Sequence, residues 1–294
     1  MLPIIISNHS SSLSLFHCST DLRFKTGISF HPKAMFTGKK ITAAPLEKGV
    51  VLVTFSNPEN KNAFDQEMAE EARSLYPVLR QKNPRVLVFA GAGEVFSAGG
   101  DFKLIEELIR THPRENKKDL LHFYKSFIRL AQFNCPTIAW INGHAVGAGF
   151  VFAMACDLRY AVNSAKVGMN FTRIGIAPGM GAEYWLRQIP PVIAREMVFT
   201  GKTYSAVELE KFQIFNECSD PETIAAKVKS IALQIAANSR KAIRFSIENL
   251  RNSRCDAAQV MKKNAAAQAR CFAGKEMPQA LEAFRKKEEY FFRD

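Results

Sequence analysis

The chain has 294 residues, 47% of them hydrophobic, and a formal net charge of +12. This length suits one large domain or two small ones, and no apolar run approaches the ~18 residues that a membrane span needs. The six cysteines are scattered without a Cys-x-x-Cys pair, which gives metal and redox chemistry little support and favours a reducing intracellular compartment. We therefore expect no metal site and no membrane span.

The positive charge is unevenly distributed, because most of the excess lies in residues 1–50 and 239–294. A basic, helical C-terminal region fits a ligand with several phosphates, and it also fits RNA. A solvated lysine-rich helix face is the ordinary explanation of the same pattern. No strand interleaves aromatic and basic residues as an RNA-recognition surface requires, so we do not expect a nucleic-acid partner.

Residues 1–40 form an N-terminal extension with seven serines and one acidic residue. This composition is typical of an organellar transit peptide, although arginine is scarce, and the apolar patch at 3–6 is too short for a secretory signal. Met35 leads directly into the globular pattern, so residues 1–34 are either a removable presequence or the result of an upstream start choice. The expected location is the cytoplasm, or an organelle matrix if residues 1–34 are a transit peptide.

The rest of the chain alternates strands and helices. Residues 50–55 form a continuous apolar run, as a strand buried on both faces would, and helical spacing follows from Phe64 to Leu79, with Pro77 in the last turn. After Gly181 the pattern predicts helix almost to the end, with strands stopping near residue 170. Between these points we predict strands at 86–90, 137–141 and 158–162, and helices at 101–110, 120–131 and 150–156.

Two glycine-rich turns, 91–101 and 142–149, each follow an apolar strand and precede a helical pattern. Bare backbone at such turns lets amide N–H groups approach a ligand oxygen, and the helix start after the second turn adds the positive end of a dipole. Two turns that face each other would supply two donors to one developing oxyanion. Neither contains Gly-x-Gly-x-x-Gly, which argues against a dinucleotide site.

Four motifs stand in register along the chain. They are Phe-Ser-Ala-Gly-Gly-Asp at 96–101, Asn-Gly-His-Ala-Val-Gly-Ala-Gly at 142–149, Ala-Cys-Asp-Leu-Arg-Tyr at 155–160 and Gly-Ile-Ala-Pro-Gly-Met-Gly at 175–181. Together they resemble the signature of the enoyl-CoA hydratase/isomerase (crotonase) superfamily, from about Val50 to the C-terminus. The resemblance implies an α/β fold, a crotonase-like spiral of ββα repeats with a helical C-terminal region, and a homotrimer or a dimer of trimers. It divides the chain into the extension at 1–40, a spiral core at 41–235 and a helical oligomerisation region at 236–294.

By position in these motifs, the oxyanion donors would be the amides of Gly100 and Ala148. The resemblance implies that they hold a thioester carbonyl while negative charge accumulates as an enolate. Hydratases of the family set two glutamates across the substrate double bond, and the matching positions here are Val151 and Phe171. Because neither side chain transfers a proton, hydration by the usual glutamate pair is not available.

The segment from Asn170 to Ala182 resembles the decarboxylating members that act in polyketide β-branching, which remove carboxylate from an acyl thioester without a glutamate base. That subgroup uses a lysine after the first oxyanion turn and a C-terminal histidine, where this chain has Phe102 beside Lys103, and Gln268. We therefore expect a lyase of the decarboxylase type, or an isomerase, in fatty acid or polyketide metabolism. The alternatives are a hydratase with relocated acid and base, and an inactive scaffold or RNA-binding relative.

Several polar residues are candidates for the missing proton-transfer groups. Glu183 lies in the first turn of a predicted helix, where the dipole keeps it ionised, so it is either a base or an ordinary first-turn carboxylate. Asn170 would hydrogen-bond substrate or water, and Lys103 would serve if its side chain turns inward. Asp101 fits a helix cap better than a base.

The coenzyme A contacts also follow from the resemblance. The loop at 57–64 resembles the family's coenzyme A loop, and Lys61 could also reach a phosphate. We expect no tightly bound cofactor, with coenzyme A entering as part of the substrate; an acyl-carrier-protein thioester would use the same phosphopantetheine arm. The predicted binding residues are Lys61, Asn62, Ala63, Asp101, Phe102, Phe284 and Lys287.

Overall fold

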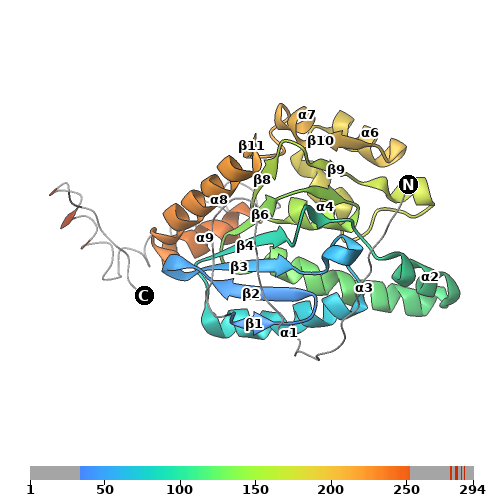
Figure 1. The fold of residues 1–294 in the computed structure, drawn as a ribbon, viewed down its shortest axis with the longest axis horizontal. Helices are drawn as coiled ribbons and strands as arrows, with labels where there is room; N and C mark the ends of the chain where they lie inside the picture. The colour runs from blue at the N-terminus through green and yellow to red at the C-terminus, as the bar shows by residue number, and fades with distance from the viewer. Residues whose placement is uncertain (1–33, 252–278, 280–281, 284–285, 287, 289–294) are drawn as a thin grey trace, which may run out of the picture.

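A seven-stranded sheet crosses the described part of this computed structural model, which comprises residues 34–251 together with 279, 282, 283, 286 and 288 (Figure 1). The strand order is β1-β2-β3-β4-β6-β8-β11. From β3 to β11 neighbouring strands are parallel, and β1 and β2 add an antiparallel edge. The strands are β1 (Phe36–Thr37), β2 (Ile41–Pro45), β3 (Val50–Phe55), β4 (Val86–Gly91), β6 (Thr137–Ile141), β8 (Leu158–Val162) and β11 (Glu217–Ser219).

A second, four-stranded sheet has the order β10-β9-β7-β5. Its strands are β5 (Val95–Ser97), β7 (His144–Val146), β9 (Lys166–Gly168) and β10 (Thr203–Ser205). Three of them come directly after strands of the large sheet: β5 after β4, β7 after β6 and β9 after β8. Each pair leads into helical structure, which confirms the expected α/β spiral of ββα repeats.

The helices cover both faces of the large sheet. In Figure 1, α1 and α3 lie along its lower side and α8 and α9 at its left, and α8 contacts strands β3, β4, β6, β8 and β11. Aspartate and serine N-caps start several of them, such as Asp65, whose carboxylate accepts from Met68 N at 2.8 Å. The helices are α1 (Gln66–Lys82), α2 (Phe102–Arg110), α3 (Pro113–Ala131), α4 (Ala148–Ala155), α5 (Ala182–Trp185), α6 (Pro191–Thr200), α7 (Ala206–Glu210), α8 (Pro221–Ala236) and α9 (Arg240–Leu250), with a 3-10 turn η3 (Asn170–Ile174) before α5.

The interior consists mainly of apolar side chains. All six residues of β3 and all six of β4 are buried, as the continuous apolar runs predict. Phe152 packs edge-on against Phe55 and Phe89, with ring centroids 5.1 and 5.0 Å apart. Phe152 belongs to α4, all eight residues of which are buried. The core therefore holds α4, and with it the second glycine turn, in a fixed position.

Three expectations from the sequence are wrong in detail. Strands do not stop near residue 170, because β10 and β11 follow; each has three residues, too few to show a period. Strands β5, β7 and β9 were not predicted for the same reason, because each also has three residues. Pro77 does not lie in the last turn of its helix, since α1 continues to Lys82. Proline has no N–H for the carbonyl four residues earlier in the helix. The helix accepts Pro77 because this residue is exposed, so that water can bond the carbonyl instead.

The division of the chain at residues 40 and 235 stays a prediction. Strand β1 lies within the first segment and pairs with β2. Helix α9 begins the third segment, most of which lies outside the described residues.

A half-buried ion pair joins the end of α9 to the sheet. Arg251 donates from Nε to Asp157 Oδ1 at 2.8 Å and from Nη2 to Asp157 Oδ2 at 2.5 Å. Asp157 Oδ2 also accepts from the backbone N and the hydroxyl of Thr137, at 2.8 and 3.0 Å. Removal of this carboxylate charge leaves the guanidinium without its partner in a partly desolvated place.

We expect Asp157→Asn to lower the free energy of unfolding by about 2–3 kcal/mol, since charged hydrogen bonds to a half-buried group are lost. Urea unfolding followed by circular dichroism measures the change. Lys227→Gln is the control, because Lys227 pairs with Glu217 at the surface and should change the midpoint far less. Equal effects in the two variants would contradict the importance assigned to the Asp157 pair.

Candidate active site

The two glycine-rich turns touch each other. Gly99 has φ +99°, and a Cβ at this residue would lie 2.7 Å from Val146 O and 3.3 Å from Ala148 N. The first turn thus comes within van der Waals contact of the start of α4, at an approach that leaves no room for a side chain. Two segments about fifty residues apart in sequence therefore form one junction.

Asn142 bonds the second turn to the first. Its Oδ1 accepts from Gly91 N at 2.9 Å, and its Nδ2 donates to Gly91 O at 2.8 Å and Gly93 O at 2.9 Å. The side chain thus pairs with Gly91 as a neighbouring strand would. Sequence reasoning did not single out this residue for a role, although its position directly before Gly143 was a usable signal. Asn142 holds the relative position of the two turns.

Two amides at this junction have no hydrogen-bond partner among the described residues: those of Gly100 and Ala148. Phe64 holds the backbone on both sides of Gly100, since Phe64 N donates to Gly99 O at 2.7 Å and Asp101 N donates to Phe64 O at 3.0 Å. Strand alternation then turns the Gly100 amide away from Phe64. Apart from its chain neighbours, no described atom lies within 4 Å of a Cβ built on Gly100, so the space on the Cβ side of this residue is open.

The Ala148 amide belongs to the first turn of α4. The helix begins at Ala148, two residues earlier than predicted, and Gly147 precedes it with φ +55° and no side chain to cap the helix. The unbonded amides of this first turn carry the positive end of the helix dipole. Because α4 is buried, the surroundings screen this charge less than water would. The arrangement suits an anionic oxygen better than a neutral one.

Asn170 and Phe171 lie beside the same junction. A Cβ built on Gly147 would be 3.3 Å from Asn170 Oδ1 and 3.8 Å from Phe171 Cζ. Val151, the position predicted to match the other family glutamate, is fully buried in α4. The two positions predicted to match the family acids therefore carry hydrocarbon side chains, and Asn170 supplies an uncharged polar group beside Gly147.

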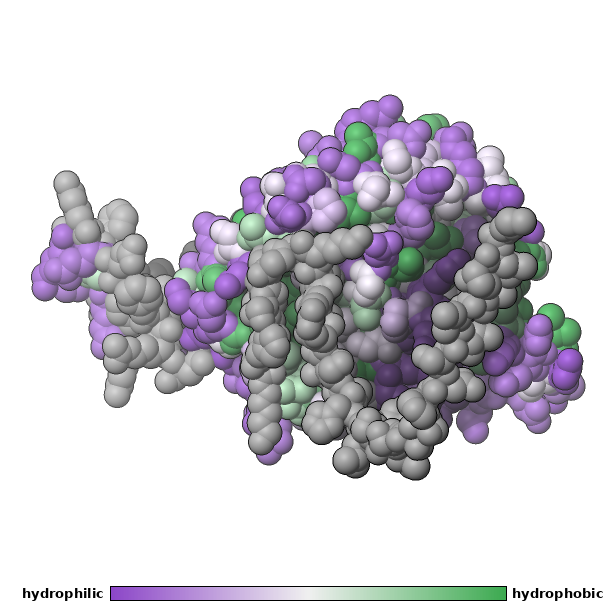
Figure 2. All heavy atoms as spheres, viewed as in Figure 1, coloured by the Kyte–Doolittle hydropathy of each residue, from purple (hydrophilic) through white to green (hydrophobic). Residues whose placement is uncertain are grey.

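The other predicted site residues occupy different surroundings. Asp101 is the N-cap of α2, as expected: its Oδ1 accepts from Lys103 N at 2.7 Å and Leu104 N at 3.3 Å. Lys103 and Glu183 are exposed. Phe102 is 72% exposed on α2, and Figure 2 shows hydrophobic atoms at the surface of this part of the molecule. Their chemical roles stay predictions.

The predicted coenzyme A loop is rigidly held. Lys61 is exposed, whereas Asn62 and Ala63 are buried. The Asn62 side chain accepts from Asn57 N at 2.8 Å, and its amide donates to two carbonyls of the first turn, at 2.9 and 2.7 Å. Of these three predicted residues, only Lys61 therefore has a side chain that a ligand can reach; Asn62 and Ala63 could contribute only their backbone. Phe284 and Lys287 lie outside the described residues.

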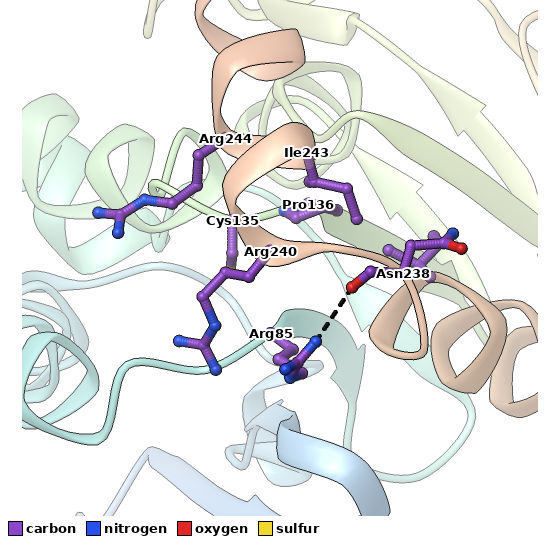
Figure 3. Close-up of a pocket in the computed structure, with 8 residues that line it drawn as sticks. Arg85, Cys135, Pro136, Asn238, Arg240, Ile243 and Arg244 are labelled. Atoms are coloured by element: carbon purple, nitrogen blue, oxygen red, sulfur yellow. Dashed lines mark hydrogen bonds between the residues drawn. The ribbon is translucent and has the colours of Figure 1, made fainter. Parts of the chain in front are cut away.

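A pocket on α9 lies at the opposite ends of the strands (Figure 3). Arg85 and Pro136, which line it, precede β4 and β6, whereas the glycine turns follow these strands. Arg85 Nη1 donates to Ala236 O at 3.0 Å and to Asn238 O at 3.1 Å, and Figure 3 shows Arg244 extending away from it. The arginines do not converge on a common point, so this pocket is not the candidate site.

Cys135 in this pocket should be chemically inert. Burial disfavours the charged thiolate and raises the pKa of Cys135 to about 12, so at pH 9 only about one thiol in a thousand is ionised. We expect no more than trace alkylation of Cys135 by iodoacetamide in the native protein at pH 9, and complete alkylation after unfolding in urea. Peptide mass spectrometry resolves the site. Rapid native labelling would show that the pocket opens to solvent.

No three His, Cys, Asp or Glu side chains of residues 34–251 and the few described beyond them gather as metal ligands. No helix in that part of the chain combines the length and apolarity of a membrane span.

Comparison with known proteins identifies the family. The family model described as enoyl-CoA hydratase/isomerase matches residues 46–294, most of the chain. The chain therefore belongs to the enoyl-CoA hydratase/isomerase family of the crotonase superfamily.

Individual relatives and a solved structure agree with this family assignment. The short-chain-enoyl-CoA hydratase of Clostridium acetobutylicum is 28% identical over 242 residues, which cover 81% of this chain and 92% of the relative. The (E)-benzylidenesuccinyl-CoA hydratase of Thauera aromatica is 32% identical over 195 residues, 64% of this chain and 73% of the relative. The crystal structure of an enoyl-CoA hydratase from Bacillus anthracis superposes with a TM-score of 0.80 at 26% identity and covers 86% of this chain and 98% of the other.

Proposed function

We propose that this protein acts on an acyl-CoA thioester by stabilising its enolate between the amides of Gly100 and Ala148. The observation that carries the proposal is the contact of the two glycine turns, which brings two unbonded amides to one junction, one of them at the start of a buried helix. Each such donor contributes about 3–4 kcal/mol when charge develops on the oxygen that it holds. The carbon next to the thioester carbonyl then becomes acidic.

We further propose that the reaction is of the lyase type, with decarboxylation preferred and isomerisation next. Val151, which is buried, and Phe171, which is half-buried, stand at the positions matched with the glutamates of family hydratases, so activation of water by that pair is not possible. Decarboxylation needs no base, because the electrons of the enolate come from the broken carbon–carboxylate bond. Asn170, beside Gly147, would orient the acyl group, and exposed Lys103 would attract its carboxylate.

Hydration is the second candidate, and the relatives favour it because those compared above are named hydratases. Glu183 would then replace the family acids. Glu183 lies in the first turn of α5, on the segment that continues from Phe171. It is the first acidic residue that follows Phe171 in the sequence.

The substrate carrier is proposed to be coenzyme A, held by Lys61 and the backbone of its loop, with Phe284 and Lys287 contributed by a neighbouring subunit of a trimer. An acyl-carrier-protein thioester would present the same phosphopantetheine arm. Full-length protein in size-exclusion chromatography with light scattering tests the trimer.

The deciding experiment offers the purified protein two kinds of thioester. Loss of the enone absorbance of crotonyl-CoA reports hydration, and release of carbon dioxide from malonyl-CoA or methylmalonyl-CoA reports decarboxylation. We expect the second and not the first. Robust hydration that Glu183→Gln abolishes would replace our proposal with the hydratase.

A catalytically inactive relative is the remaining alternative. Such a protein would not exchange the α-hydrogens of a bound acyl-CoA with deuterium from solvent. If instead it binds RNA through its basic C-terminal region, that binding should weaken steeply with salt.

A further inference from the structure

The side chain of Tyr124 on α3 reaches the loop at 175–181, which follows η3. Its Oη would lie 2.7 Å from a Cβ built on Gly179, and its ring carbon Cζ 3.1 Å away, so the hydroxyl occupies space that only a glycine at 179 leaves open. Gly179 belongs to the same segment as Asn170 and Phe171, which flank Gly147. Met180, next to Gly179, is buried with a left-handed backbone at φ +55°. This strained loop therefore brings Gly179 up to the tyrosine.

Helix α3, which carries Tyr124, packs against α4, the helix that begins with Ala148. The Gln132 side chain at the C-terminal end of α3 donates to Ala155 O at the C-terminal end of α4. Tyr124 therefore belongs to a helix that contacts the one carrying the second proposed donor.

A neighbour of Tyr124 packs against the residue that holds the first glycine turn. Phe127, three residues further on the same face of α3, stacks on Phe64 with ring centroids 4.3 Å apart and planes at 7°. Phe64 is the residue whose backbone bonds to both sides of Gly100. The face of α3 that carries Tyr124 is thus packed against Phe64, which bonds to the first turn.

The Tyr124 hydroxyl has no hydrogen-bond partner among the described residues. Burial raises the pKa of Tyr124, so the phenol keeps its proton at neutral pH. The described side chains nearest to Gly147 and Gly179 are Asn170, Phe171 and Tyr124, and of these three only the tyrosine has a dissociable proton. Tyrosine thus offers an acid where this chain lacks the family's glutamates.

We propose that Tyr124 is the general acid that protonates the enolate, an inference that rests on the proposed function. In the step, the bond from the α-carbon to the carboxylate breaks and carbon dioxide leaves. The electron pair of the broken bond stays on the acyl group and forms the enolate, whose oxygen the two amides hold. The α-carbon then takes the proton of the Tyr124 hydroxyl. Water returns a proton to the phenolate, and the hydroxide produced combines with carbon dioxide as bicarbonate. An acid fixed on one side of the enolate delivers its proton to one face only.

The test is the decarboxylation of methylmalonyl-CoA in deuterium oxide by the wild-type chain and by Tyr124→Phe. The wild-type chain should form one enantiomer of 2-deuteriopropionyl-CoA. Tyr124→Phe should release carbon dioxide within about tenfold of the wild-type rate, because the amides still stabilise the enolate, but should give a racemic product, because water then protonates both faces. Tyr160→Phe is the matched control: this tyrosine is buried on β8, away from the glycine turns, and should keep the wild-type stereochemistry.

Folding is checked by urea unfolding of both variants, which should keep the wild-type midpoint, since Tyr124→Phe removes a hydroxyl without a partner and retains the ring. A single enantiomer from Tyr124→Phe would overturn the assignment of the acid while decarboxylation stands. A wild-type chain that releases no carbon dioxide from malonyl-CoA or methylmalonyl-CoA would overturn the proposed function, and this assignment with it.

Discussion

Ala148→Pro keeps the fold and loses about 10²–10³-fold in kcat, the loss that follows when one oxyanion donor is removed. Ala148 is the first residue of α4, and this is the helical position where proline is tolerated best, because its N–H makes no bond within the helix. Gly147, the residue before it, has φ +55° and ψ −124°. These angles lie in the mirror image of the β region, which only glycine adopts freely. The substitution thus removes one donor and leaves the helix.

The measurement is kcat on the thioester that the wild-type chain turns over, together with the urea midpoint. Gln66→Pro provides the folding control, since Gln66 is the exposed first residue of α1 behind the cap Asp65. Its unfolding free energy should change by less than about 1 kcal/mol. If Ala148→Pro folds as well as this control and turns over substrate at the wild-type rate, the Ala148 amide takes no part in the reaction.

Gly149→Ala should damage stability strongly, because the added methyl group has no room between α4 and β5. A Cβ at Gly149 would lie 2.6 Å from Ser97 Cβ and 2.8 Å from both the carbonyl oxygen and Oγ of Ser97. Ser97 cannot move away, because its hydroxyl donates to Asn62 O and accepts from Gly99 N, at 2.8 and 3.2 Å. We expect a loss of about 3 kcal/mol, the upper end for overpacking of a core.

Gly100→Ala is the matched control for stability, because no described atom lies within 4 Å of the added methyl group. Its unfolding free energy should stay within about 0.5 kcal/mol of wild type. Urea unfolding of the two variants side by side measures the difference. A Gly149→Ala chain as stable as Gly100→Ala would mean that β5 and α4 are not in the close contact described above.

Sequence patterns predicted the elements whose residues are buried over a long stretch. The runs at 50–55 and 86–90 became β3 and β4, and the helical stripe at 120–131 became most of α3, because each buries a regular set of apolar side chains. The three-residue strands escaped prediction, since their pairing is decided by partners far away in the chain.

The candidate site could be predicted only in its backbone. Glycine spacing and motif resemblance indicated the two turns, and position before an apolar-periodic segment indicated the Asp101 cap. Tyr124 falls within the helix predicted at 120–131, and that prediction gave its side chain no separate role. That its hydroxyl meets Gly179, more than fifty residues away, follows from packing that no local pattern encodes.

The anion-binding groups of the proposed site belong to the main chain, and this has an evolutionary consequence. Point mutations to any residue except proline exchange side chains and leave the peptide N–H in place, so descendants of one ancestor can lose acidic side chains, as we propose for the positions of Val151 and Phe171, without losing the activation of a thioester. Inheritance would then conserve the reactive intermediate, while each lineage selects anew what becomes of it.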